Sequence, residues 1–94
     1  MTSIPIAMNR QRRRLVNEAL AAYLEWREEC SAVSLAYSRW ASADASEASF
    51  SYAAYAAALE REERASELYA GVVADVAKIL GVAPAITSAR RVPR

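Results

Sequence analysis

The acidic residues are the first candidates for chemistry in this sequence. Seven glutamates lie in its middle part and could form a carboxylate cluster: Glu25, Glu28, Glu29, Glu60, Glu62, Glu63 and Glu67. Helical di-iron proteins hold their metal with inward glutamates and Glu-x-x-His pairs, but this chain contains no histidine. We therefore expect these side chains on solvated helix surfaces, with no metal and no cofactor. Glu62 is the exception because it falls in an apolar repeat. We expect it to contact Arg27, a tyrosine hydroxyl or a partner chain.

Nucleophilic and redox chemistry find little support. The single cysteine, Cys30, rules out an intramolecular disulfide and is expected to be a buried thiol. An intermolecular disulfide or a reactive thiol is the alternative. Serines are numerous, but without histidine they form no familiar triad. We expect a protein that is not an enzyme. A cytoplasmic location is expected, with secretion without a signal peptide as the alternative.

Basic residues concentrate near both ends of the chain. Residues 1–18 and 75–94 together carry eight basic and two acidic side chains, a net +6, while residues 19–74 carry four basic and nine acidic ones, a net −5. A hairpin would bring both basic segments to one end, which could contact an acidic protein, nucleic acid or anionic lipid head groups. The solubility of a small protein is an equally good explanation. The candidate contact residues are Arg10, Arg12, Arg13, Arg14, Arg90, Arg91 and Arg94.

A long apolar repeat must position these groups. With spacings of three and four residues it runs through Val16, Ala19, Tyr23, Trp26, Cys30, Val33, Tyr37 and Trp40. Such a seam predicts a helix over about residues 9–42 that buries one face against another helix. The arginines near its start oppose the helix dipole. This indicates either that the helix begins earlier, near Pro5, or that the arginines meet an anion.

A second seam follows in a different phase. It comprises Ala48, Ser51, Tyr55, Ala58, Glu62, Ala65, Tyr69, Val72, Val76 and Ile79. Asp44 with Glu47 is typical of a capping box. The phase change and this cap favour a turn at about 42–46 and a second helix at about 45–80, over one continuous helix. Gly81 predicts the helix end, and Gly71 suggests a close approach of the two helices.

The predicted fold is all-α: an antiparallel, coiled-coil-like two-helix hairpin over residues 9–81, with a short leader at 1–8 and a basic flexible tail at 82–94. The expected register pairs Tyr37 with Phe50, Trp26 with Glu62, and Val16 with Val72. Two helices cannot cover all the aromatic side chains, so we expect a homodimer that forms a four-helix bundle. Its expected interface residues are Tyr23, Trp26, Val33, Tyr37, Trp40, Phe50, Tyr55 and Tyr69.

These features favour a small, non-enzymatic protein–protein interaction or scaffold module that self-associates and contacts an acidic partner through its basic end. A nucleic-acid-binding accessory protein is the first alternative. Aromatic rings can stack on bases, although their helical spacing favours packing in a core. No run approaches the about 20 apolar residues of a transmembrane helix.

The length and two-helix plan resemble the WXG100 (ESAT-6-like) family of small secreted helical hairpins. That family carries Trp-x-Gly at the bend, and Trp40-Ala41-Ser42 lies near the corresponding place with serine for glycine. The family's C-terminal Tyr-x-x-x-Asp/Glu signal has no counterpart, because Tyr69 is followed four residues later by Val73. The resemblance implies a secreted effector or a chaperone-like partner, which is the second alternative.

Overall fold

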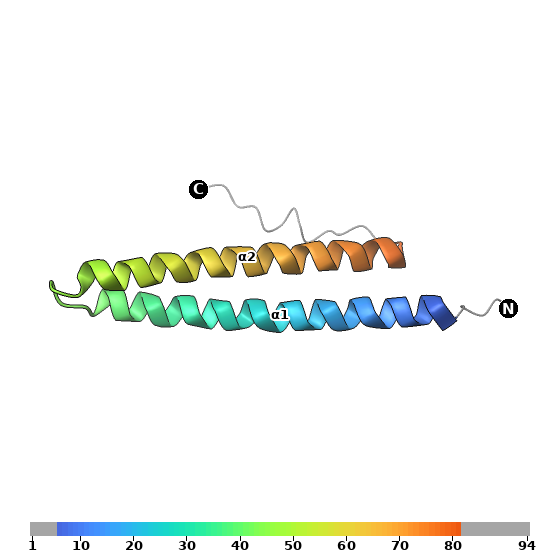
Figure 1. Cartoon of the computed structure of the whole chain (residues 1–94), viewed down its shortest axis with the longest axis horizontal. Coiled ribbons are helices and arrows are strands. Elements are labelled where there is room, and N and C mark those ends of the chain that lie inside the picture. The colour runs from blue at the N-terminus through green and yellow to red at the C-terminus, as the bar shows by residue number, and fades with distance from the viewer. Residues whose placement is uncertain (1–5, 82–94) are drawn as a thin grey trace.

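Two long antiparallel helices make up the computed structural model, which describes residues 6–81 (Figure 1). Helix α1 spans Ile6–Ala41 and α2 spans Ala48–Leu80. They lie side by side along almost their whole length, joined by a short connection at one end. The predicted all-α hairpin is therefore confirmed, and the described residues contain no strand. The expected tail and most of the expected leader lie outside this range.

Helix α1 begins three residues before the expected start at residue 9. The earlier start explains why arginines are tolerated near the beginning of the helix, because Arg10 is its fifth residue instead of lying in its first turn. The dipole acts mainly within the first turn, so its penalty on the arginine cluster is small. No anion is needed to explain their position.

The connection is organised by Asp44. Its Oδ1 accepts hydrogen bonds from the backbone N–H groups of Ser46 and Glu47, both at 3.1 Å, and from Ser46 Oγ at 2.8 Å. Asp44 therefore orders a turn over 44–47, and α2 begins one residue later. Half of the predicted capping box is present, because Asp44 Oδ1 accepts the hydrogen bond from the Glu47 N–H. Glu47 itself is the N-cap residue of α2, and no side-chain hydrogen bond caps it.

The C-terminal end of α2 matches the prediction. Gly81 adopts a left-handed conformation with φ of 74°, and its N–H points to the carbonyl oxygens of Ala77 and Lys78. The expectation for Gly71 was wrong. An added Cβ at Gly71 would meet no atom within 4 Å, so no close approach of the helices requires glycine there.

The two seams differ in how well they describe the buried faces. Every residue of the α2 seam is buried or half-buried. In α1 the buried face is rotated, so that Leu15, Ala22 and Ala36 lie inward, while Tyr23 and Tyr37 lie at its edge. Small alanines lie at the centre of the contact line, which is the line along which the two helices meet, and the rings of Tyr23 and Tyr37 fit beside it.

The register also differs from the expected one. The ring pairs Tyr37–Tyr55 and Tyr23–Tyr69 both centre on Ser46, whereas the expected pairs Tyr37–Phe50 and Val16–Val72 centre on about residue 44. Tyr37 therefore meets Tyr55 instead of Phe50, and Val16 shares a small cavity with Val76 instead of Val72. The displacement is about one helical turn, because the connection extends to Glu47 before α2 begins.

Candidate interaction surfaces

The first aromatic cluster lies in the middle of the hairpin. The rings of Trp26 and Tyr69 stack with centroids 5.7 Å apart and planes 13° apart, and Tyr23 packs against both. The Trp26 indole Nε1–H donates a hydrogen bond of 2.7 Å to Glu62 Oε2. The predicted proximity of Trp26 and Glu62 is thus confirmed, but the hydrogen-bond partner of Glu62 is this indole instead of Arg27 or a tyrosine hydroxyl.

A second aromatic cluster of the same design lies near the connection. Trp40 stacks on Tyr55 with centroids 5.4 Å apart and planes 16° apart. Tyr37 meets both rings edge-on, and Tyr52 meets Trp40 at 5.0 Å. Each of the two tryptophans of α1 therefore stacks one ring face on a tyrosine of α2.

A sequence signal for this design exists but was missed. The motif Tyr-x-x-Trp occurs at Tyr23 and Trp26 and again, fourteen residues later, at Tyr37 and Trp40. Fourteen residues are two heptads, so both copies lie on the same side of α1. The tyrosines Tyr55 and Tyr69 of α2 are also fourteen residues apart.

The predicted interface residues fall into three groups in the structure. Five are half-buried between the helices: Trp26, Val33, Trp40, Tyr55 and Tyr69. Tyr23 and Tyr37 remain 38% and 51% exposed. Phe50 is 81% exposed and lies apart from the aromatic clusters, beside Arg39 and Ser51. The structure therefore places six of the eight in the two aromatic clusters, buries Val33 partly between the helices, and separates Phe50 from them.

One side of the hairpin forms an apolar face. Each side chain extends from the flank of the contact line that carries Tyr23 and Tyr37 on α1, and Tyr52 on α2. The residues of this face, all between 38% and 57% exposed, are Val16, Leu20, Tyr23, Tyr37, Tyr52, Leu59 and Leu80. Half-buried Cys30 and Val73 lie in the same two rows. The expected burial of Cys30 is thus only partial.

The opposite side is a polar face. Glu29 Oε1 and Arg61 Nε form an ion pair of 3.4 Å, and Glu25 and Arg64 lie beside it around an open groove. Leu68 completes the lining of that groove. Within residues 6–81 there is no group of three or more histidine, cysteine or acidic side chains placed to hold a metal ion.

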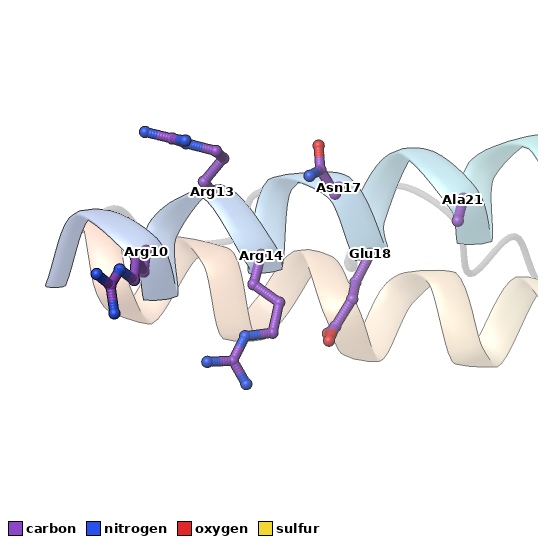
Figure 2. A pocket seen from close by; sticks show the side chains of 6 residues that line it. All are labelled: Arg10, Arg13, Arg14, Asn17, Glu18 and Ala21. Carbon is purple, nitrogen blue, oxygen red and sulfur yellow. The ribbon is translucent and has the colours of Figure 1, made fainter. Parts of the chain in front are cut away.

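The arginine cluster separates into an outer and an inner part. Arg10, Arg13 and Arg14 are exposed and line one open, shallow stretch of the α1 surface together with Asn17 and Glu18 (Figure 2). Arg14 and Glu18 extend to the same side of α1, whereas Arg13 projects away from them (Figure 2). The outer arginines can therefore approach an anion without rearrangement of the helices.

Arg12 does not belong to that outer surface. It is half-buried and lines a small cavity with Val16, Val76 and Leu80, and its Nε has no hydrogen-bond partner within the described part of the chain. Its aliphatic stem covers apolar side chains at the open end of the hairpin, which is the end where α1 begins and α2 ends. Arg90, Arg91 and Arg94 lie outside the described residues.

Comparison with protein-family models, curated proteins and solved structures gives no match for this chain. The resemblance to the WXG100 family therefore gains no support beyond the two-helix plan. Neither helix is long and apolar enough to cross a membrane, as far as the described residues extend.

Proposed function

We propose that this protein is a small non-enzymatic interaction module that self-associates through its apolar face, forming a four-helix bundle from two hairpins. A single observation carries this proposal. Seven large apolar side chains remain 38–57% exposed on one side of the hairpin, where helical spacing also places exposed Arg27, whereas the opposite side carries the Glu29–Arg61 ion pair beside Leu68. Contiguous exposed apolar patches of this kind mark interfaces, and packing two hairpins face to face would remove this one from water.

Sedimentation across a micromolar concentration series tests self-association. Leu20→Gln, in the apolar face, should weaken the dimer by at least about tenfold, because Leu20 is 57% exposed in one hairpin and a symmetric dimer buries two copies of it. Burying a whole leucine side chain contributes about 1.5–3 kcal/mol. Leu35→Gln is the matched control, because Leu35 has nearly the same exposure, 53% against 57%, but lies outside that face. A monomer at every concentration, or equal effects of the two substitutions, would contradict the proposal.

The basic end is the proposed contact for an acidic protein partner. Arg10, Arg13 and Arg14 are exposed on one stretch of α1, and arginine binds carboxylates through paired hydrogen bonds. Binding of labelled polyglutamate at low salt should fall when these three residues are replaced by glutamine. Replacing Arg39, Arg61 and Arg64 changes the charge equally at another place and should have a smaller effect.

Nucleic acid is the second candidate partner, because the same three exposed arginines could contact successive phosphates. Affinity for duplex DNA would then fall with salt, with a slope of about −0.9 for each phosphate neutralised. Little sequence preference is expected, since phosphate contacts carry no base information. One face of each tryptophan already stacks on Tyr55 or Tyr69 and both indoles are half-buried, which disfavours stacking on bases. DNA binding that exceeds polyglutamate binding would favour this alternative.

A further inference from the structure

Side-chain size changes along the apolar face. The open end carries the aliphatic residues Val16, Leu20 and Leu80, and the end near the connection carries Tyr37 and Tyr52. The face is therefore not symmetric along its length, so the direction in which a second copy packs on it has consequences for packing.

Two symmetric arrangements can join two such faces. In the first, both connections lie at the same end and α1 of one protomer packs on α2 of the other. In the second, the connections lie at opposite ends and each helix packs on its own counterpart. Both keep neighbouring helices antiparallel, so helix packing alone does not distinguish them.

Side-chain packing favours the second arrangement, in which the two connections lie at opposite ends. The row from Val16 to Tyr37 on α1 is centred near Trp26, and the row from Tyr52 to Leu80 on α2 is centred on Ser66. In the opposite-end arrangement, the two-fold axis of the dimer runs across the helices at this level. It sets Val16 against the partner's Tyr37 and Tyr52 against the partner's Leu80. Large side chains then meet smaller ones, which fills space well.

The same-end arrangement gives a poorer fit. It stacks the Tyr37 level of one protomer on the Tyr52 and Tyr55 level of the other, so that bulky rings oppose bulky rings. At the open end, Val16 would then oppose Leu80. These shorter side chains would have to fill the same distance between the two hairpins that the rings fill at the other end. Faces that pack well alternate large and small side chains.

Charge favours the same choice. The open end carries five cations against two carboxylates: Arg10, Arg12, Arg13, Arg14 and Lys78 against Glu18 and Asp75. The same-end arrangement would crowd two such groups within a bundle width, where like charges repel. The opposite-end arrangement separates them and sets the Arg10 level against the connection of the other protomer, which exposes Asp44 and Glu47.

The available area is sufficient for a stable dimer. A large side chain that is about half exposed contributes about 80 Å², roughly half of the 150–250 Å² an aromatic residue buries. Seven such residues contribute about 550 Å². A standard interface buries about 800 Å² per partner, of which about 65% is apolar in homodimers, or about 520 Å².

We infer that a second copy of this chain covers the apolar face with its connection at the opposite end, so that Val16 packs on the partner's Tyr37 and Leu80 packs on the partner's Tyr52. This inference rests on the self-association proposed above and adds its direction. The dimer would then present one group of exposed arginines at each end, separated along its axis by about 45 Å at 1.5 Å per residue. Such a molecule can bind two anionic sites at once.

Distances between spin labels on the two protomers test the direction. Labels are placed one at a time, in a Cys30→Ala background, at exposed positions near the connection (Ala45→Cys) and near the open end (Gln11→Cys). From the helical rise, the inferred dimer places the two Ala45 labels about 55 Å apart and the two Gln11 labels about 45 Å apart. Ser31→Cys, close to the centre, should give a short distance in either arrangement and reports dimer formation itself.

The outcomes separate the two proposals. Long distances at both ends together with a short one at position 31 support the opposite-end dimer. Distances of about 20–30 Å at all three positions, which is a bundle width plus the labels, would overturn the direction but leave self-association in place. A monomeric mass with no distance at any position would overturn both proposals. It would mean that another part of the chain or a different protein covers the face.

Discussion

The indole nitrogen of Trp26 and the carboxylate of Glu62 are joined across the hairpin by a 2.7 Å hydrogen bond, although they are 36 residues apart in the chain. Glu62 lies in the seam of α2, where an apolar residue would be expected. The bond gives this acidic side chain a partner between the helices and leaves the ring of Trp26 free to stack on Tyr69.

Removing the carboxylate should destabilise the hairpin. Glu62→Ala leaves the half-buried indole N–H without its acceptor, which should lower the free energy of unfolding by about 1–2 kcal/mol. Glu62→Gln keeps an oxygen acceptor and should recover part of this loss. Glu63→Ala, next to it but exposed, should change stability by less than about 0.5 kcal/mol. Urea denaturation at one fixed protein concentration measures all three. Equal losses for Glu62→Ala and Glu63→Ala would show that the bond contributes nothing.

The two aromatic groups near the connection should respond differently to truncation. Trp40 stacks on Tyr55 and also meets Tyr37 and Tyr52, so Trp40→Ala should cost about 3 kcal/mol, the low end for a tryptophan lost from a core. Phe50 is 81% exposed, so Phe50→Ala should leave the melting temperature nearly unchanged. A large loss at Phe50 would instead indicate that it packs in an interface on the polar face.

The connection should weaken in acid through Asp44. The Ser46 hydroxyl, followed by the backbone N–H groups of Glu47 and Ser46, lowers the pKa of Asp44 below its ordinary value of 3.8. Since the folded pKa is lowered, the contribution of this carboxylate is fully present above that ordinary value. It disappears as pH falls through the lower folded pKa. Asp44→Ala should therefore be less stable than the wild type at pH 7, and the difference should shrink as pH falls below 3.8 through the lower folded pKa.

Melting curves of the two proteins between pH 2 and pH 7 measure this convergence. Asp75→Ala, which removes an exposed carboxylate far from the connection, is the control. A stability difference between Asp44→Ala and the wild type that stays constant down to pH 2 would contradict the role of the Asp44 carboxylate.

The two described glycines should respond to alanine in opposite directions. Gly71 is exposed within α2 and has no neighbour within 4 Å of an added Cβ, so Gly71→Ala should stabilise the protein by about 0.5–1 kcal/mol. Gly81 has φ of 74°, a conformation that costs alanine about 1–2 kcal/mol. Gly81→Ala should therefore destabilise the end of α2. Thermal denaturation followed by circular dichroism gives both values, and a destabilising Gly71→Ala would reveal a contact at that position.

The sequence alone determined the local features of this protein. Heptad spacing predicted two helices and identified the buried positions of α2, because the period of a helix repeats along its whole length. Asp44 and Gly81 predicted where the chain turns and where α2 ends, because their preferences act on neighbouring backbone groups. The approximate proximity of Trp26 and Glu62 also followed, since two long side chains tolerate a displacement of one turn.

Only the tertiary structure decided how the two helices meet. A repeated seam looks nearly the same after a slide of one turn, so spacing could not choose between Phe50 and Tyr55 as the partner of Tyr37. The turn that Asp44 organises delays the start of α2 and sets that register. Once the helices are in register, small alanines lie at the contact line, and Tyr23, Tyr37 and Tyr52 lie at one edge of it. This edge is the apolar face of the hairpin, and the opposite side is the polar face. The tertiary structure decides this, because the exposure of each side chain depends on which residues of the other helix it faces.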